Sequence, residues 1–106
     1  MAKSSQDTDR TILELTHEVV RGLLSLNAKD YGEASITQCK NIAANIGTLL
    51  APQLYGARIH GVGNAISMVI RSCAEALFWL HFSDKPDEKV IADVEKLMAL
   101  LSSPSL

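Results

Sequence analysis

The segment Asn64 to Phe82, NAISMVIRSCAEALFWLHF, decides the fold class that this sequence predicts. Its apolar residues recur three and four positions apart, a spacing that places them on one face of an α-helix. The stripe begins upstream of the segment and comprises Ile59, Val62, Ile66, Val69, Ile70, Cys73, Leu77 and Leu80. We therefore predict a helix over about 54–82 with a soft point at 60–63, and a loop over 53–62 is the alternative.

Three more segments share this period and predict three more helices, at about 8–27, 32–50 and 86–102. Pro52 should end the second helix, because proline disfavours the α conformation of the residue before it. Ser83 or Asp84 should cap the last helix, with Pro86 in its first turn. Four amphipathic helices joined by short loops predict an all-α, antiparallel four-helix bundle.

The length of 106 residues fits one domain spanning 1–106, with 1–6 and 103–106 expected to be flexible ends. Apolar residues make up 47% of the chain and charged residues 21%, which is typical of globular proteins and excludes intrinsic disorder. The net charge of -2 disfavours nucleic-acid binding, since proteins that follow phosphate backbones carry a basic excess. The sequence has no secretory signal and no apolar run of the roughly 20 residues that span a bilayer. We therefore expect a cytoplasmic protein without a membrane span.

Charge is distributed unevenly along the chain, because residues 41–82 contain only Arg58, Arg71 and Glu75 as charged residues. On a helical wheel, the third helix has an outward face that comprises Met68, Ser72, Glu75, Trp79 and Phe82. Aromatic residues on an outward face are typical of an interface, and tryptophan is a frequent anchor. We predict that this face joins two copies in a homodimer, the commonest symmetric assembly. The alternative is that these residues belong to the core of their own chain.

Arg58 and Arg71 are the only cations in this charge-poor stretch, and their spacing allows both to border one surface. They are candidates for contacting an anion or a carboxylate of a partner. The alternative is that each head group extends into solvent while its stem covers apolar surface.

No catalytic, cofactor or metal site is recognisable in the sequence. The three histidines lack the partners at helical spacing that a metal site requires. Cys39 and Cys73 occupy apolar positions, which is typical of buried, reduced thiols and not of nucleophiles. We therefore expect no enzyme activity, no cofactor and no metal ion. An apolar pocket near Cys73 and Trp79, in a small-ligand carrier or an enzyme, is the alternative.

Two segments resemble parts of known families of small helical proteins. Gln38 to Gly47, QCKNIAANIG, resembles the segment that follows the phosphorylated histidine of histidine-phosphotransfer domains. Thr37 stands at the place of that histidine, so the resemblance implies an adaptor that cannot carry a phosphohistidine. Leu80 to Ile91, LHFSDKPDEKVI, is similar to the junction of the third and fourth helices in bacteriocin-immunity proteins, which are four-helix bundles of about this length.

These observations favour a non-enzymatic helical module that binds another protein, including a second copy of itself. One alternative is a small adaptor or bacteriocin-immunity-like protein that recognises a peptide or a receptor. The other is the ligand carrier or enzyme described above.

Overall fold

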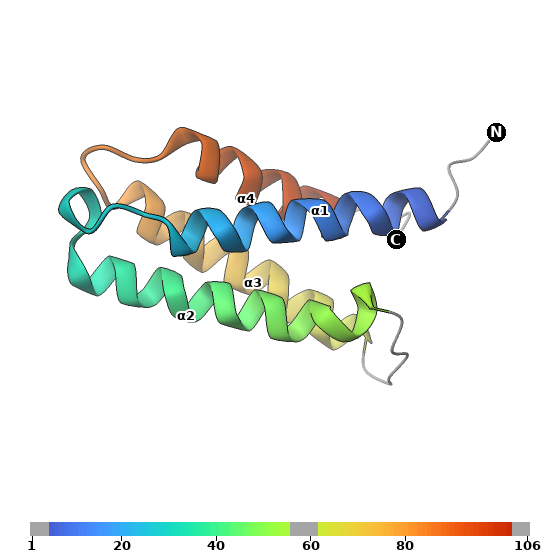
Figure 1. Cartoon of the computed structure of the whole chain (residues 1–106). Coiled ribbons are helices and arrows are strands. Elements are labelled where there is room, and N and C mark those ends of the chain that lie inside the picture. Colours follow the sequence, from blue (N-terminus) through green and yellow to red (C-terminus); the bar gives the residue numbers. More distant parts are fainter. Residues whose placement is uncertain (1–4, 56–61, 103–106) are drawn as a thin grey trace.

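Four α-helices make up the described part of the chain, and no strand occurs in it (Figure 1). The computed structural model describes residues 5–55 and 62–102. The helices are α1 (Ser5–Leu24), α2 (Ala28–Leu54), α3 (Val62–His81) and α4 (Glu88–Leu101). The all-α class and the four helices predicted from the apolar stripes are therefore confirmed.

The helices pack side by side in the order α1, α2, α3 and α4, and α4 packs back against α1. Within the described ranges, the backbones of α1 and α3, and those of α2 and α4, do not approach each other closely. The α1–α2 and α3–α4 connections lie at the same end of the bundle (Figure 1). Each helix therefore has one side in the shared core, two flanks against its neighbours and one side facing outward.

Apolar side chains from all four helices fill the core. The most completely buried large side chains are Val19, Leu23, Ile46, Leu50, Val69, Leu80, Val94 and Leu97. Cys39 and Cys73 are buried among them, each with 0% exposure. Burying one side chain of this size stabilises a protein by roughly 1.5–3 kcal/mol, so these contacts hold the helices together.

The side of α3 that faces the core is rotated relative to the predicted stripe. Its buried residues are Val69, Ser72, Cys73, Ala76 and Leu80, whereas Ile66, Ile70 and Leu77 are only partly buried. The centre of the buried side thus lies closer to Ser72 and Ala76 than the stripe indicated. These small side chains allow α3 to approach the middle of the bundle closely.

The predicted end of the second helix is wrong, because α2 passes through Pro52 and ends at Leu54. Leu54 packs against the core, and the Tyr55 N–H donates to the Ala51 carbonyl oxygen at 3.0 Å. Proline disfavours a helix but does not forbid its last turn, where one missing N–H donor removes a single bond. Packing of Leu54 compensates for that loss.

The predicted third helix over 54–82 does not begin at 54, because Leu54 is the last residue of α2, and α3 is described from Val62 to His81. Residues 56–61, which include part of the predicted soft point, lie outside the described residues. Of the predicted flexible ends, 1–4 and 103–106 also lie outside them, whereas Ser5 and Gln6 belong to α1.

The other predicted ends are shifted by a few residues because different side chains act as caps. α1 ends at Leu24 instead of near 27, and the Asn27 side chain caps α2 by accepting from the Lys29 N–H at 2.8 Å. Asp87, and not Ser83 or Asp84, caps α4 by accepting from the Val90 N–H at 3.1 Å. The helices thus begin at side-chain oxygens that satisfy their first free amides.

Hydrogen bonds connect the start of α2 to the α3–α4 connection. Gly32 has a φ of 82°, which glycine adopts without strain, and it separates the first turn of α2 from the rest of the helix. The Asp87 N–H donates to the Tyr31 hydroxyl at 2.6 Å, and Ser83 Oγ donates to the Asp30 carbonyl oxygen at 2.7 Å. Burial raises the pKa of Tyr31 above its ordinary value, which already lies well above neutral pH.

Candidate functional site

The outer side of α3 carries most of the large apolar side chains that the described structure exposes. Met68, Phe78 and Phe82 are 52%, 62% and 66% exposed, and the other two such residues, Leu24 and Tyr55, lie on α1 and at the end of α2. Contiguous apolar patches on a protein surface are typical of binding sites. The outer side of α3 is therefore the candidate site.

Phe78, Trp79 and Phe82 form an aromatic cluster at the C-terminal end of α3. The Phe78 and Trp79 rings are perpendicular with centroids 5.1 Å apart, and the Trp79 and Phe82 centroids are 5.9 Å apart. The Phe78 and Phe82 rings are stacked at 6.2 Å. Trp79 also packs against the core, so it supports two exposed phenylalanine rings from below. The cluster presents a preorganised apolar surface.

The structure places the five predicted interface residues at different depths. Met68, Glu75 and Phe82 are exposed, Trp79 is half-buried, and Ser72 is only 9% exposed. This spread follows from the rotation of α3, which turns Ser72 and Trp79 inward. Three of the five side chains are thus available at the surface.

Phe78 belongs to this surface, although the sequence analysis did not include it. The predicted wheel was centred on a stripe that contains Leu77, and this placed Phe78 toward its edge. A wheel centred on Val69, Cys73 and Leu80, which are fully buried, places Phe78 on the outward side. The signal that could have found it is its spacing of four residues from Phe82.

A shallow hollow of about 280 Å³ lies between α2 and α3. Its lining residues are Asn45, Thr48 and Leu49 from α2 and Met68, Arg71, Ser72 and Glu75 from α3. The hollow thus brings Arg71, a predicted partner contact, beside three of the predicted interface residues. Cys73 and Trp79, which marked the alternative pocket, do not line it, and Arg58 lies outside the described residues.

We call the exposed strip along which α2 and α3 adjoin, which excludes the charged residues on the other side of α2, the α2/α3 face. It comprises Asn41, Ala44, Asn45, Thr48, Met68, Arg71, Glu75, Phe78 and Phe82. Only Arg71 and Glu75 in this set are charged, and neither forms an ion pair within the described residues. A surface with few charges loses little hydration energy when a partner covers it.

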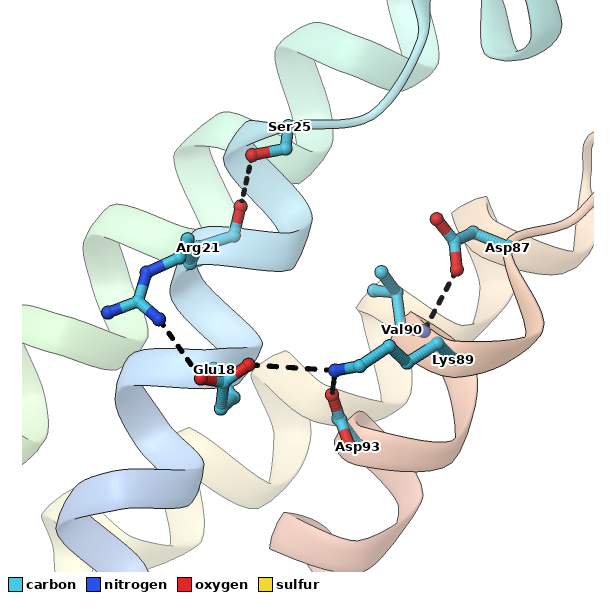
Figure 2. A network of polar contacts seen from close by, with 7 residues as sticks. All are labelled: Glu18, Arg21, Ser25, Asp87, Lys89, Val90 and Asp93. Carbon is cyan, nitrogen blue, oxygen red and sulfur yellow. Dashed lines mark hydrogen bonds and ion pairs between the residues drawn. The ribbon is translucent and has the colours of Figure 1, made fainter.

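The opposite surface of the bundle, formed by α1 and α4, which we call the α1/α4 face, carries Glu18, Arg21, Lys89 and Asp93 (Figure 2). Arg21 contacts Glu18 at 3.0 Å, and Lys89 contacts Glu18 at 3.5 Å and Asp93 at 2.9 Å. The hydrogen bond from Lys89 to Asp93 and the charge of that carboxylate raise the pKa of Lys89. A hollow of about 210 Å³ beside the network is lined by the same four side chains and their neighbours. These charges are paired within the chain itself.

The two thiols have surroundings that disfavour nucleophilic chemistry. Burial raises the pKa of Cys39 and of Cys73 to about 11. The reactive form of cysteine is the thiolate, which is scarce at neutral pH when the pKa is this high. Both residues are unpaired and fully buried, as predicted from their places in the apolar stripes.

Among residues 5–55 and 62–102, no three His, Cys, Asp or Glu side chains gather closely enough to hold a metal ion. His17 lies 3.2 Å from the Tyr55 hydroxyl, in a hydrogen bond that joins α1 to the end of α2. His81 is exposed at the end of α3. In the described part of the chain, no helix combines the length and the apolar character needed to cross a membrane.

No known protein family, curated protein or solved structure matches this chain.

Proposed function

We propose that the protein is a non-enzymatic helical interaction module that forms a homodimer through the α2/α3 face. Within each copy we take neighbouring helices to run antiparallel, as short connections favour in helical bundles. The observation that carries the proposal is the group of exposed side chains Met68, Phe78 and Phe82 on a face with few charges. Two unpaired, buried thiols agree with a protein of the reducing cytoplasm.

Phe78→Glu tests this proposal, because it places a charge in the aromatic cluster of the α2/α3 face at a position that is 62% exposed. We expect the wild-type protein to be a dimer in light scattering at high micromolar concentration and Phe78→Glu to be a monomer with unchanged helix content. Leu24→Glu is the matched control, since Leu24 is 52% exposed but belongs to α1. It should stay dimeric. A monomeric wild-type protein, or a dimeric Phe78→Glu variant, would contradict the proposal.

Trp79 remains a predicted anchor of the interface, but its substitution is a less selective test. Its ring packs against the core as well as against both phenylalanines. Trp79→Glu therefore removes core packing together with any interface contact. A monomeric variant could then result from unfolding instead of from loss of the interface.

An adaptor that binds a peptide is the second candidate, and the hollow between α2 and α3 favours it. This hollow offers polar side chains at Asn45, Thr48 and Arg71 next to the apolar side chain of Met68. Such a combination suits an extended or helical peptide with one apolar anchor. If the protein is such an adaptor, light scattering should show a monomeric wild-type protein.

A further inference from the structure

Arg71 and Glu75 are the only acidic or basic residues of α3 apart from His81. They lie one helical turn apart, carry opposite charges and are both exposed. Within the described residues, neither has an ion-pair partner. Arg71 and Glu75 are therefore one cation and one anion that a partner can reach on an otherwise uncharged outer side of α3.

The pattern around these two charges is symmetric under reversal of the helix. Met68 precedes Arg71 by three residues, and Phe78 follows Glu75 by three residues. Reading the helix backwards thus exchanges an apolar side chain with an apolar one and a cation with an anion. Spacings of three and four keep all four residues on one side of the helix.

We propose that α3 pairs with α3 of a second copy in antiparallel alignment, with the two-fold axis midway between Arg71 and Glu75. Arg71 of each copy then faces Glu75 of the other, and Met68 of each faces Phe78 of the other. This inference rests on the proposed self-association and adds the direction and register of the two helices. A parallel pair would instead place Arg71 against Arg71 and Glu75 against Glu75, which is repulsive.

The exposed apolar side chains supply part of the area that this arrangement would bury. Met68, Phe78 and Phe82 are each more than half exposed, which leaves on the order of 100 Å² of each side chain to bury. The three residues thus offer roughly 300 Å² per copy, against the roughly 800 Å² per partner of a standard interface. The uncharged side chains of α2 that flank α3, among them Asn45 and Thr48, supply further surface without adding unpaired charges.

Charge reversal tests the register directly. Arg71→Glu places a glutamate against Glu75 of the other copy, and Glu75→Arg places an arginine against Arg71. Each single variant should weaken dimerisation at least tenfold in sedimentation equilibrium, because two attractive contacts become repulsive. The double variant Arg71→Glu/Glu75→Arg restores opposite charges at both contacts and should return the dissociation constant to within about threefold of the wild-type value.

The two proposals fail in different ways in this experiment. A monomeric wild-type protein overturns both of them. If the wild type dimerises and Phe78→Glu prevents it, but the single charge reversals change nothing or the double variant fails to recover, only the antiparallel register is overturned. Both substitutions lie at exposed positions, and circular dichroism verifies the fold of each variant. Should the double variant not fold, an equimolar mixture of the two single variants replaces it: weakened homodimers of each single variant together with heterodimers in the mixture support the register, and persistent monomers in the mixture overturn it.

Discussion

The α1/α4 face and the α2/α3 face differ in where their charges find partners. Glu18, Arg21 and Lys89 form a connected set of ion pairs that also includes Asp93. On the α2/α3 face, by contrast, Arg71 and Glu75 have no ion-pair partner in the described structure, and aromatic rings are exposed next to them. The ion pairs of the first surface form within one copy of the chain, whereas the second surface has the composition of one that a partner covers.

Both faces cover the same core. The need to form that core therefore does not explain why the α2/α3 face exposes aromatic side chains. Leu23 of α1 and Val94 of α4 are as deeply buried as Val69 and Leu80 of α3. A helix needs an apolar stripe on one side to pack into such a bundle. α3 has that stripe and, in addition, Phe78 and the other exposed apolar residues on its outer side, which the fold of a single copy does not use.

The largest effect should come from truncating the core beneath both faces. Leu23 and Leu24 are adjacent in α1 but 1% and 52% exposed. Leu23→Ala should lower the free energy of unfolding by about 2–5 kcal/mol, because it leaves a cavity. Leu24→Ala should change it by less than about 1 kcal/mol. Urea denaturation measures both values, and equal effects would contradict the burial on which the comparison depends.

A high-pH experiment addresses the buried inner sides of α2 and α3. Burial raises the pKa of Cys39 and Cys73 from 9.0 to about 11, so the unfolded chain releases these protons first. The contribution of the two protonated thiols to the free energy of unfolding is therefore complete below pH 9. It is lost as the pH rises toward 11. It should fall by about 1 kcal/mol per thiol at pH 10.

The matched control for the pH experiment is the double variant Cys39→Ala/Cys73→Ala. It is expected to be less stable at every pH but to lose less stability than the wild type between pH 8 and pH 10. The remaining decline reports other groups, including Tyr31, whose pKa is also raised by burial. Parallel curves for the two proteins would show that the thiols are not buried as described.

Alanine substitutions at two glycines, Gly22 and Gly47, probe how tightly the helices pack around each position. A methyl group added at Gly22 of α1 would lie 2.9 Å from a methyl carbon of Val90 on α4, whereas one added at Gly47 of α2 would meet nothing within 4 Å. Gly47→Ala should stabilise the protein by up to about 1 kcal/mol through helix propensity. Gly22→Ala should be less stable than Gly47→Ala by about 1–3 kcal/mol, because overpacking opposes the same gain. Thermal or urea unfolding of both variants provides the measurement.

The smallest effect should come from the ion pairs of the α1/α4 face. Glu18→Gln removes the carboxylate that both Arg21 and Lys89 contact. Because these pairs are exposed, we expect a loss of no more than about 1 kcal/mol, which 1 M NaCl should reduce further. Dimerisation should be unaffected. If Glu18→Gln weakened the dimer, the interface would include the α1/α4 face, which contradicts the proposed α2/α3 interface.

The sequence was sufficient to predict the four helices and the buried places of both cysteines. Helical period alone carries that information, since Val19, Leu23, Val94 and Leu97 recur at the spacing of a buried stripe. Helix ends were less predictable because they depend on local competition. Pro52 is accommodated in the last turn of α2 because Leu54 packs against the core, a tertiary contact that no local pattern contains.

The candidate site was only partly predictable for a related reason. The predicted stripe treated Ile66, Leu77 and Val69 alike, whereas the structure buries Val69 fully and the other two only in part. With α3 in this orientation the small side chain of Ala76 is fully buried, and Phe78 is 62% exposed. Which side of an apolar helix faces its own bundle therefore depends on packing against its neighbours.

Hydroxyl-radical footprinting at increasing protein concentration tests most directly that the α2/α3 face is covered in solution. The readout compares the oxidation of Met68, Phe78 and Phe82 with that of Leu24, which is equally accessible on α1. We predict that the three α3 residues become protected as the concentration rises from low to high micromolar, while Leu24 stays unchanged. Oxidation of Met68, Phe78 and Phe82 that does not change with protein concentration would contradict the account.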